Sequence, residues 1–473
     1  MIDRAEILDV ATDLSLPHDI IEKDYVLGWL LAGIYAQDAL ASAWTFKGGT
    51  CLKKCYFETY RFSEDLDFTL SDQAHLDDAF LRPVFGAISA WVYEQTGIEL
   101  PADQMRFETF RNPRGGLSGE GRIYYNGPLG RGGSLPRIKL DLTADEILVL
   151  PAVERPVNHP YSDAPPGGIM ARCYAYEEIF AEKIRALGER ARPRDLYDVI
   201  SLFRHGEFRP AAAAVYDILK RKCGSRRIAV PTLPSVTGAA PELLADWKAM
   251  LGHQLPMLPP FESFWAALPE CFGWLESGAA PPVLATAPIG AEEEVVRPPI
   301  GSLRRQGVAG SSFLELVRFA GANRLCVDLA YDGSIRRIEP YSLRRTLAGN
   351  IVLYAVRVDS GEPRSYRLDR IQGVEVTGQG FVPRYVIELS PTDPGIPPTT
   401  GRSGGSTRSS FLTGFRPSVR KSRPKSGPTY VIQCSLCGKK FERTTQSGRL
   451  RAHKSPQGWN CSGRTGFYIG TKY

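Results

Sequence analysis

The segment from Asp65 to Leu70 constrains the fold of this chain more than any other part of its 473 residues. Polar and apolar side chains alternate there, in the order Asp-Leu-Asp-Phe-Thr-Leu. This period of two predicts a β-strand with one buried face, so Asp65 and Asp67 project from the same side, about 7 Å apart along the strand. Two such carboxylates repel each other unless a cation lies between them, and a hard divalent ion with oxygen ligands suits that position.

A glycine-rich turn precedes this strand. The run Lys47-Gly48-Gly49-Thr50 leads into a helix-like stretch. Glycine permits close approach of the backbone to a ligand, and the N–H groups at the start of a helix can bind phosphate. We therefore predict that this run binds the phosphates of a nucleotide. Without the glycine turn, the alternating aspartates would be equally compatible with a solvated strand face.

A third carboxylate is expected on a neighbouring strand, where it would complete the metal shell or take a proton from an attacking hydroxyl. Residues 136–143 alternate in the same way and place Asp141 on the polar face. Asp141 is therefore the candidate. The alternative for this residue is an exposed strand aspartate with no function.

Two predicted helices downstream contribute further charged residues. Lys183 falls in the middle of the apolar stripe of the first helix, Tyr176 to Leu187, where an ammonium group needs an anion. That anion is either a triphosphate or a structural carboxylate. Pro193 begins the second helix. Near its start, Asp195 either complements the helix dipole or contacts the Lys183 side of the site.

Taken together, these segments resemble the AbiEii-type nucleotidyltransferases, which are toxin components of bacterial abortive-infection and toxin–antitoxin systems. The matching runs, in order within residues 1–210, are EKDY, FKGGTCLKKCY, RFSEDLDF, EEIFAEKIRAL and RPRDLYDV. The resemblance implies an α+β, polymerase-β-like fold, with a mixed sheet flanked by helices and a helical C-terminal part. It also implies the use of magnesium and a nucleoside triphosphate (NTP).

The resemblance assigns roles to individual residues of this chain. Gly48, Gly49 and Thr50 would bind phosphate. Asp65 and Asp67 would ligate magnesium, with Asp141 as the expected third ligand. Lys183 and Asp195 would form a pair from the later motifs. Members of the family transfer nucleotides to RNA, in some cases to tRNA.

Composition divides the chain into five segments. Residues 1–275 mix helical and strand patterns, and 276–299 form a Pro/Ala-rich linker. Residues 300–392 contain short alternating runs broken by Gly turns, which predicts a small β-rich domain. Residues 393–428 are rich in Gly, Ser, Pro and Arg, which predicts a disordered basic linker. Residues 429–473 return to aromatics and cysteines.

The β-rich segment resembles a WYL domain, an Sm/SH3-like β-barrel often found as a sensor in bacterial defence regulators. The resemblance runs from Leu316 to Leu389, although Val-Leu-Tyr stands where the family has Trp-Tyr-Leu. Arg337, Arg367 and Arg370 would face a polyanionic or nucleotide ligand. The alternative is that they are ordinary surface arginines.

The last segment has the ligand spacing of a variant zinc finger, Cys434-x2-Cys437-x15-His453-x7-Cys461. Two thiolates from one turn, with a His and a Cys from a second, supply four ligands for tetrahedral zinc. A tip of this size has too small a core to fold alone, and a metal would supply the deficit. Several nearby cations would contact phosphates of nucleic acid, among them Lys439, Lys440 and Arg443.

Charge is distributed unevenly between the body and the tail. Residues 401–473 carry 15 Lys/Arg and one acid, whereas residues 1–400 carry 43 basic and 51 acidic groups. A tail of +14 on a body of −8 suggests that the tail binds a polyanion, RNA more readily than DNA. The alternative is a solvated and inert basic tail.

The N-terminus lacks the basic-then-apolar layout of a signal peptide. The longest apolar stretch, Tyr25 to Ala36, is too short to span a bilayer. We therefore expect a cytoplasmic protein without membrane segments. The six cysteines outside the tail, including Cys51 and Cys55, fit reduced thiols.

The leading hypothesis is therefore a magnesium-dependent nucleotidyltransferase that acts on RNA as a toxin in phage defence, with a possible antitoxin partner. Its rival is a nucleic-acid-sensing regulator whose enzyme-like domain only binds nucleotide. A third possibility, nucleotidyl transfer to protein, would use the same site. Three carboxylates favour an enzyme, because a protein that only binds nucleotide has no need for them.

Overall fold

The computed structural model divides into two compact units, Met1–Arg402 and Ser403–Tyr473, which are described separately. The described residues are 1–391 apart from 113–114, 131, 207, 279–283, 291–292, 301–302 and 304–307, and 429–472 apart from 435, 438, 444–449, 451–452, 456–459 and 462–464. The disordered linker that the sequence predicts at 393–428 lies outside the described residues.

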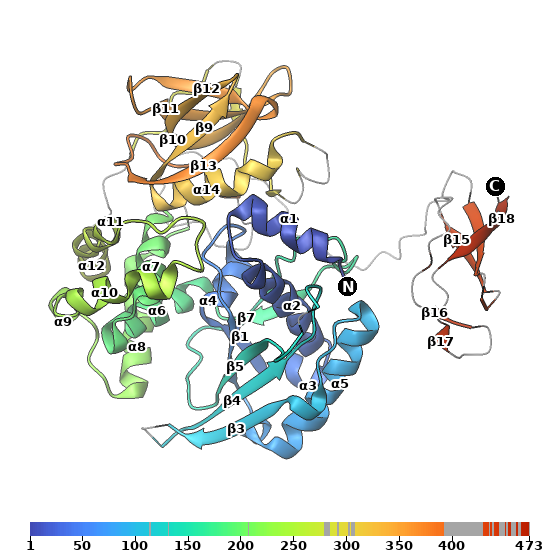
Figure 1. Ribbon diagram of the computed structural model, residues 1–473. Helices are drawn as coiled ribbons and strands as arrows, with labels where there is room; N and C mark the ends of the chain where they lie inside the picture. Colours follow the sequence, from blue (N-terminus) through green and yellow to red (C-terminus); the bar gives the residue numbers. More distant parts are fainter. Residues whose placement is uncertain are drawn as a thin grey trace, which may run out of the picture. The chain divides into compact units, whose positions relative to one another are not determined.

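Seven strands of the described part of the first unit form a mixed sheet (Figure 1). In spatial order they are β3 (Arg106–Arg111), β4 (Leu117–Tyr124), β5 (Arg137–Thr143), β2 (Asp65–Leu70), β1 (Trp44–Lys47), β7 (Met170–Cys173) and β6 (Val153–Pro156). The pairs β2–β5 and β1–β7 are parallel, and the other neighbours are antiparallel. The predicted α+β class with a mixed sheet is confirmed. The alternating runs around Asp65 and Asp141 are β2 and β5.

The first half of the chain supplies helices that pack against this sheet or against one another. They are α1 (Arg4–Leu14), α2 (His18–Tyr35), α3 (Asp38–Ala41), α4 (Gly48–Cys51) and α5 (Asp78–Thr96), with a π-helical turn η1 (Leu52–Tyr56) and 3₁₀ turns η2 (Gln73–Leu76) and η3 (Ala102–Gln104). Helix α2 contacts α5 and β7 and is apolar on most of its circumference, which is typical of a buried helix. The helix-like stretch predicted after the glycine turn is α4 continued by η1.

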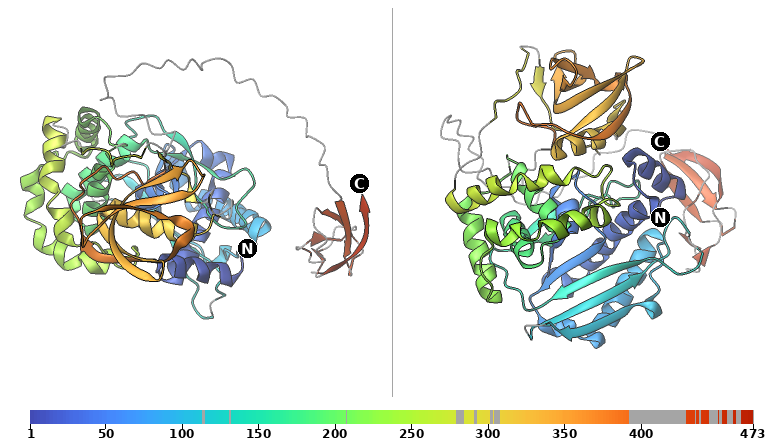
Figure 2. Two further views of the ribbon diagram at one scale, coloured as in Figure 1. Left: turned by 90° about the horizontal axis from the view of Figure 1, so that it is seen from above. Right: turned by 60° about the vertical axis from the view of Figure 1, so that its left-hand side comes forward.

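A helical part follows the sheet (Figure 2). It comprises α6 (Tyr176–Arg190), α7 (Pro193–Arg204), α8 (Ala212–Arg226), α9 (Leu233–Thr237), α10 (Ala240–Leu251), α11 (Phe261–Trp265) and α12 (Leu268–Ser277). Helix α7 begins at Pro193, as predicted, and buries the apolar stripe that its sequence shows. Helix α6 contacts both α7 and α8, so the two helices that carry Lys183 and Asp195 lie side by side.

The WYL-like region forms an antiparallel sheet with one packed helix, α14 (Leu314–Asn323). Its strands are β8 (Glu293–Val295), β9 (Leu325–Tyr331), β10 (Ser334–Thr346), β11 (Ile351–Arg357), β12 (Pro363–Arg367) and β13 (Ile371–Gly380), with 3₁₀ turns η4 (Ser311–Phe313) and η5 (Leu368–Arg370). The described residues pair in the order β12-β11-β10-β9-β13, with β8 beside β10. The predicted β-rich region is confirmed. Among the described residues, β12 and β13 are the two edge strands of this sheet and do not pair with each other, so the described pairings do not form the closed barrel that the resemblance implies.

Helix α14 is joined to the part of the unit that carries the seven-stranded sheet by buried ion pairs. The guanidinium of Arg318, only 2% exposed, donates from Nη1 to Glu58 Oε2 at 2.7 Å and from Nη2 to the Pro298 carbonyl at 2.5 Å. Lys53 Nζ lies 3.6 Å from Glu315 Oε1. Glu58 belongs to the segment between η1 and β2. Helix α14 is therefore bound to the segment that connects the glycine turn to the strand that carries Asp65 and Asp67.

The second unit contains a three-stranded antiparallel sheet and a two-stranded ribbon. The sheet has the order β15 (Lys440–Arg443), β14 (Thr429–Cys434), β18 (Gly466–Lys472), and the ribbon pairs β16 (His453–Lys454) with β17 (Asn460–Cys461). The ribbon places His453 directly opposite Cys461. Among the described residues of both units, no helix has the length and apolar character needed to cross a membrane.

The anchoring of α14 leads to a prediction about cooperativity. Arg318→Ala should cost about 3–5 kcal/mol, because it leaves the Glu58 carboxylate without its buried guanidinium partner. Calorimetry should then show the WYL-like region melting ahead of the rest. The control is Arg337→Ala, which removes a half-exposed ion pair from the WYL-like sheet and should change stability little, because solvent screens this pair. Equal effects of the two substitutions would contradict a structural role for the Arg318 contact.

Candidate active site

The sheet aligns charged residues from four neighbouring strands in one row. The matched positions are Glu120 on β4, Asp141 on β5, Asp67 on β2 and Lys47 on β1. Side chains in register on adjacent strands share a face, and Asp65 joins that face two residues before Asp67. The parallel pairing of β2 with β5 therefore brings together the three carboxylates that the sequence singled out, Asp65, Asp67 and Asp141.

The charges of these carboxylates are not fully compensated by the protein. Burial, and then the charge of Asp141, raise the pKa of Asp67 to about 6, although Lys47 and Lys183 act in the opposite direction. The pKa of Asp65 is also raised, by burial and by Asp141. Three carboxylates on one face offer only oxygen donors, the ligands that magnesium prefers, and such an ion would neutralise the repulsion.

Glu120, in the same row, was missed by the sequence analysis. Its strand carries Gly119 and Gly121 on either side, and these glycines remove the apolar alternation that reveals a strand. Glu120 is bound to two cations, with Lys139 Nζ 3.2 Å from Oε2 and Arg122 Nε 2.9 Å from Oε1. Lys139 also lies 2.9 Å from Asp141 Oδ1. The carboxylate row therefore has a basic border on its β4 side.

The glycine turn lies directly against the metal-site strand. Gly48 has a φ of +83°, and a Cβ atom there would lie 2.1 Å from Asp67 Oδ2. A Cβ on Gly49 would lie 2.6 Å from Arg61 Nη2. The left-handed backbone and this close approach require glycine at Gly48, whereas a side chain at Gly49 would displace the Arg61 guanidinium. The Thr50 hydroxyl donates to the backbone carbonyl of Asp65. This hydrogen bond holds the glycine turn against the start of β2 and uses the hydroxyl proton, which is then not directed at a ligand.

Lys47 is engaged within the protein. Its ammonium lies 2.5 Å from Glu146 Oε2 and 3.6 Å from Glu182 Oε1. Glu146 also lies within 4 Å of further basic groups, those of Arg185, Lys222 and Arg226. Despite the cost of burial, Glu146 and Glu182 keep the pKa of Lys47 above its usual value. Nothing in the sequence indicates Glu146, because it follows β5 in an irregular segment.

Lys183 meets a structural carboxylate, which is the second of the two alternatives for this residue. Its Nζ lies 2.7 Å from Oδ2 of Asp198, which is fully buried. Arg61 donates to the same carboxylate from Nε and Nη2, both at 2.7 Å, and Tyr60 donates its hydroxyl at 2.9 Å. Burial opposes the charge of Asp198, yet Arg61 and Lys183 hold the pKa of Asp198 well below its usual value.

Asp195, which the resemblance groups with Lys183 as a residue of the later motifs, pairs with Arg190 and not with Lys183. Asp195 accepts two hydrogen bonds from Arg190, at 2.8 Å each, and is fully buried. Asp198, one turn further along α7, takes the position against Lys183. Both acids lie on the same helix, and the packing of α6 on α7 determines which of them faces Lys183.

The WYL-like arginines have acidic neighbours of their own. Arg337 binds Asp328 with two hydrogen bonds of 2.7 Å, and Arg367 binds Asp369 at 3.0 and 2.7 Å. Arg370 is exposed. For Arg337 and Arg367 the geometry is that of surface ion pairs, which was the alternative to ligand binding.

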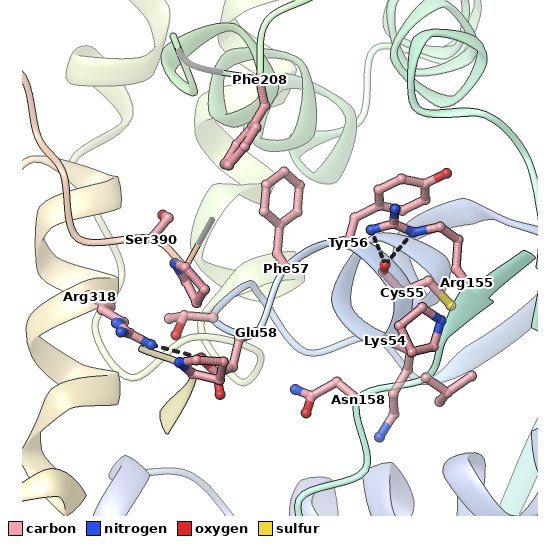
Figure 3. Close-up of a pocket in the computed structure, with 15 residues that line it drawn as sticks. Lys54, Cys55, Tyr56, Phe57, Glu58, Arg155, Asn158, Phe208, Arg318 and Ser390 are labelled. Atoms are coloured by element: carbon pink, nitrogen blue, oxygen red, sulfur yellow. Dashed lines mark hydrogen bonds and ion pairs between the residues drawn. The ribbon is translucent and has the colours of Figure 1, made fainter. Parts of the chain in front are cut away.

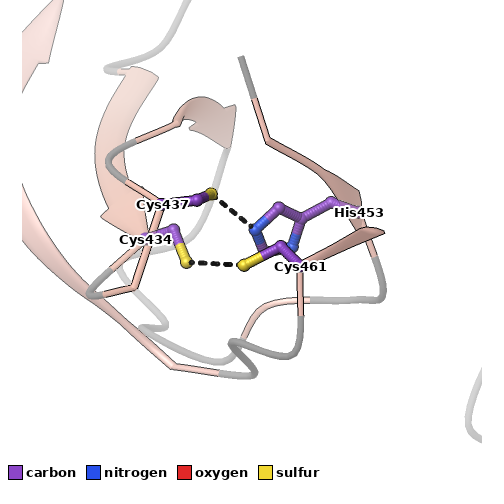
Figure 4. Close-up of side chains that lie close together, drawn as sticks. All are labelled: Cys434, Cys437, His453 and Cys461. Carbon is purple, nitrogen blue, oxygen red and sulfur yellow. Dashed lines mark hydrogen bonds between the residues drawn. The ribbon is translucent and has the colours of Figure 1, made fainter. Parts of the chain in front are cut away.

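The four predicted zinc ligands converge in the second unit (Figure 4). The ligand atoms of Cys434, Cys437, His453 and Cys461 all lie within 4.8 Å of one another. Cys437 Sγ is 3.2 Å from His453 Nε2, and Cys434 Sγ is 3.9 Å from Cys461 Sγ. Three thiols and one imidazole fit tetrahedral zinc.

The cations predicted to contact nucleic acid lie beside this cluster in sequence. Lys440 is exposed, and Lys439 lies with its Nζ 5.9 Å from the ring centre of Phe441. Arg443 ends β15, but its side chain is outside the described residues.

Comparison with known families assigns most of the first unit. The sequence model described as "Nucleotidyl transferase AbiEii toxin, Type IV TA system" matches residues 29–269, slightly more than half of the chain. The chain belongs to the AbiEii family. A WYL domain model matches residues 312–376 of this AbiEii-family protein, within the antiparallel sheet and its helix.

Two solved structures show more distant likenesses. JHP933 from Helicobacter pylori is 17% identical, with a TM-score of 0.37, and the match covers 56% of the AbiEii-family chain and 94% of JHP933. Proteasome accessory factor B/C of Arthrobacter aurescens is 13% identical, with a TM-score of 0.14, over 78% and 74% of the two chains. Comparison with curated protein sequences gives no match.

The raised pKa of Asp67 predicts a pH-dependent stability. Its folded-state value of about 6 exceeds the ordinary 3.8, so the metal-free protein should lose stability as the pH rises from about 4 through 6. Asp67→Asn should therefore stabilise the metal-free protein at pH 7, by about 3 kcal/mol at most, and give no gain near pH 4. Urea unfolding in EDTA at the two pH values measures this. An equal effect at both would contradict carboxylate repulsion.

The Asp198 cluster predicts unequal costs for its members. Asp198→Ala should cost about 3–5 kcal/mol, because it leaves the buried Arg61 and Lys183 without their shared anion. Lys183→Met should cost less, since Arg61 still neutralises Asp198. Urea unfolding of the two variants gives the comparison. If Lys183→Met left stability unchanged and weakened NTP binding, the lysine would serve the nucleotide and not the fold.

Proposed function

We propose that this protein is a magnesium-dependent nucleotidyltransferase that transfers a nucleoside monophosphate from an NTP to a hydroxyl group of RNA, tRNA being one candidate, and acts as a toxin in phage defence. The observation that carries the proposal is the in-register placement of Asp67 and Asp141 on parallel strands, with Asp65 beside them and Gly48 against Asp67. Family membership supports nucleotidyl transfer, while the RNA acceptor rests on the resemblance alone.

Asp65, Asp67 and Asp141 would hold magnesium in a polymerase-β-like arrangement. When bound, magnesium offsets the negative charge of the triphosphate and of the three carboxylates. In the reaction, the acceptor oxygen forms a bond to the α-phosphorus as the bond to pyrophosphate breaks. The hydroxyl proton needs an acceptor, and Asp141 is the candidate because it lies next to Asp67 in the row and beside Lys139.

The surrounding ion pairs would hold the glycine turn and the carboxylates in fixed positions. Arg61 donates to Asp198 on α7, and the same guanidinium packs against Gly49. It therefore links the helical part of the unit to the glycine turn. Lys47 is held by Glu146, which follows the strand that carries Asp141. Preorganisation of this kind lets a site bind the triphosphate without rearrangement of its charges.

The other modules would direct the enzyme. The tail would bind zinc through Cys434, Cys437, His453 and Cys461 and contact nucleic acid through its cations. The WYL-like domain would respond to a ligand and act on the site through α14, which is bound to Glu58. The family also implies a cognate antitoxin protein. This activity would need NTP and RNA, so we expect it to act in the cytoplasm.

Replacing a metal ligand tests the proposed chemistry. Asp67→Asn should lower magnesium-dependent labelling of RNA by at least about 100-fold, because the site loses the carboxylate at its centre. The assay incubates the protein with labelled NTPs, magnesium, and total cellular RNA or protein, and identifies the labelled fraction. The control is Asp103→Asn, which changes an exposed aspartate of the turn η3 that is not part of the carboxylate row. This variant should retain activity.

Two outcomes would redirect this proposal. Label in protein instead of RNA would make the acceptor a polypeptide. Binding of NTP without any transfer by the wild type would favour the alternative, a nucleic-acid-sensing regulator with a nucleotide-binding domain.

Removing the tail tests its proposed role in binding. A chain ending after Pro391 should keep its activity on a short generic acceptor but lose affinity for long RNA. For the full chain, affinity should fall about tenfold or more between about 50 and 200 mM salt, as expected when a few phosphates are neutralised. Fluorescence anisotropy with labelled RNA gives both values. Equal affinities of the two chains at every salt concentration would show that the tail does not bind RNA.

A further inference from the structure

Three cysteines of the first unit meet in the core, beneath the glycine turn. Cys51 belongs to α4, Cys55 to η1 and Cys173 to the end of β7. Their sulfur atoms all lie within 4.8 Å of one another. Cys51 and Cys173 are fully buried and Cys55 is 4% exposed. The nucleotidyl-transfer chemistry proposed above makes no use of these thiols.

The local backbone brings the three sulfurs together. Cys51 and Cys55 lie four residues apart, where the helix changes from α to π geometry, and Phe57 N donates to the Leu52 carbonyl at 2.8 Å in the i→i+5 pattern. π-helical turns are rare in proteins, and those that occur are often found at functional sites. Cys173 is held opposite this turn by the sheet, since β7 runs parallel to β1.

A buried cation lies beside the thiols. Arg155, only 4% exposed, donates from Nε and Nη2 to the Cys55 carbonyl at 3.2 and 3.1 Å. A positive group next to cysteines favours thiolates, which are the form that binds metal.

Thiolate ligands and burial determine which ion would fit. Three thiolates select a soft or borderline ion, and at a zinc–sulfur distance of about 2.3 Å the sulfurs would be roughly 4 Å apart. That separation is within the 4.8 Å limit of this cluster. A divalent ion on three thiolates has a net charge of −1, which the single guanidinium of Arg155 balances.

A pocket lies beside Cys55, on one side of the cluster. A pocket of about 290 Å³ is lined by Cys55 and Arg155, together with Tyr56 and Phe57 (Figure 3). The pocket is open to solvent and has room for water. A water molecule from this side would complete the tetrahedral coordination that zinc prefers.

We propose that Cys51, Cys55 and Cys173 form a second zinc site, separate from that of the tail. The ion would join the helix that begins at Gly48 to strand β7, and so fix the glycine turn against the sheet. Three reduced thiols packed as small apolar groups are the opposing interpretation. The two differ in metal content, which is measurable without any assay of catalysis.

The test uses the full chain with the tail site disabled by Cys434→Ser and Cys461→Ser. Purified under reducing conditions from cells grown with zinc, this variant should contain about one zinc per chain, against about two for the wild type. Growth with cobalt in place of zinc should give a sulfur-to-cobalt charge-transfer band in the same variant. This measurement leaves the three core cysteines unchanged.

A further substitution assigns the ligands. Cys51→Ala in the tail-disabled chain should remove the remaining ion, whereas Cys271→Ala, at a buried cysteine outside the cluster, should leave it in place. A folded tail-disabled chain with neither zinc nor the cobalt band would overturn the proposal. Zinc retained at one equivalent after Cys51→Ala would overturn it as well.

Discussion

Repulsion among the carboxylates of Asp65, Asp67 and Asp141 is the constraint on which the rest of the first unit depends. Side-by-side strands force the three charges onto one face, and burial raises the pKa of Asp67 to about 6. The fold must therefore supply enough stability elsewhere to keep this face assembled. The Asp198 cluster, in which one buried carboxylate binds Arg61 and Lys183, is placed to do so because it ties α6 and α7 to the segment before β2.

The sequence predicts the parts of this site that depend on local patterns. Asp65 and Asp67 could be found because alternation along a strand is visible in six residues, and the glycine turn could be found because two adjacent glycines precede a helix-like stretch. The partner of Lys183 could not be found. Asp195 and Asp198 are one helical turn apart, and only the packing of α7 on α6 selects Asp198. The same holds for Glu146, which reaches Lys47 from an irregular segment 99 residues away.

In the WYL-like region and the tail, too, features set by short sequence spacings could be predicted, and contacts between distant residues could not. The cluster of three cysteines and one histidine in the tail was predictable because metal coordination requires particular residue types at short spacings. The arginines of the WYL-like region were not, because Arg337 meets Asp328 across the β9–β10 pair, and strand register cannot be read from composition. Likewise, the burial of Arg318 against Glu58 joins residues 260 positions apart.

The most direct test of the central claim is to locate a divalent ion in crystals. Crystals grown with manganese and a non-hydrolysable NTP analogue should show an anomalous scattering peak coordinated by Asp65, Asp67 and Asp141, with the triphosphate against Gly48 and Gly49. Manganese accepts the same oxygen ligands as magnesium and scatters strongly enough to be identified. A bound nucleotide with no manganese at these carboxylates, or manganese held elsewhere with the three carboxylates unoccupied, would contradict the account.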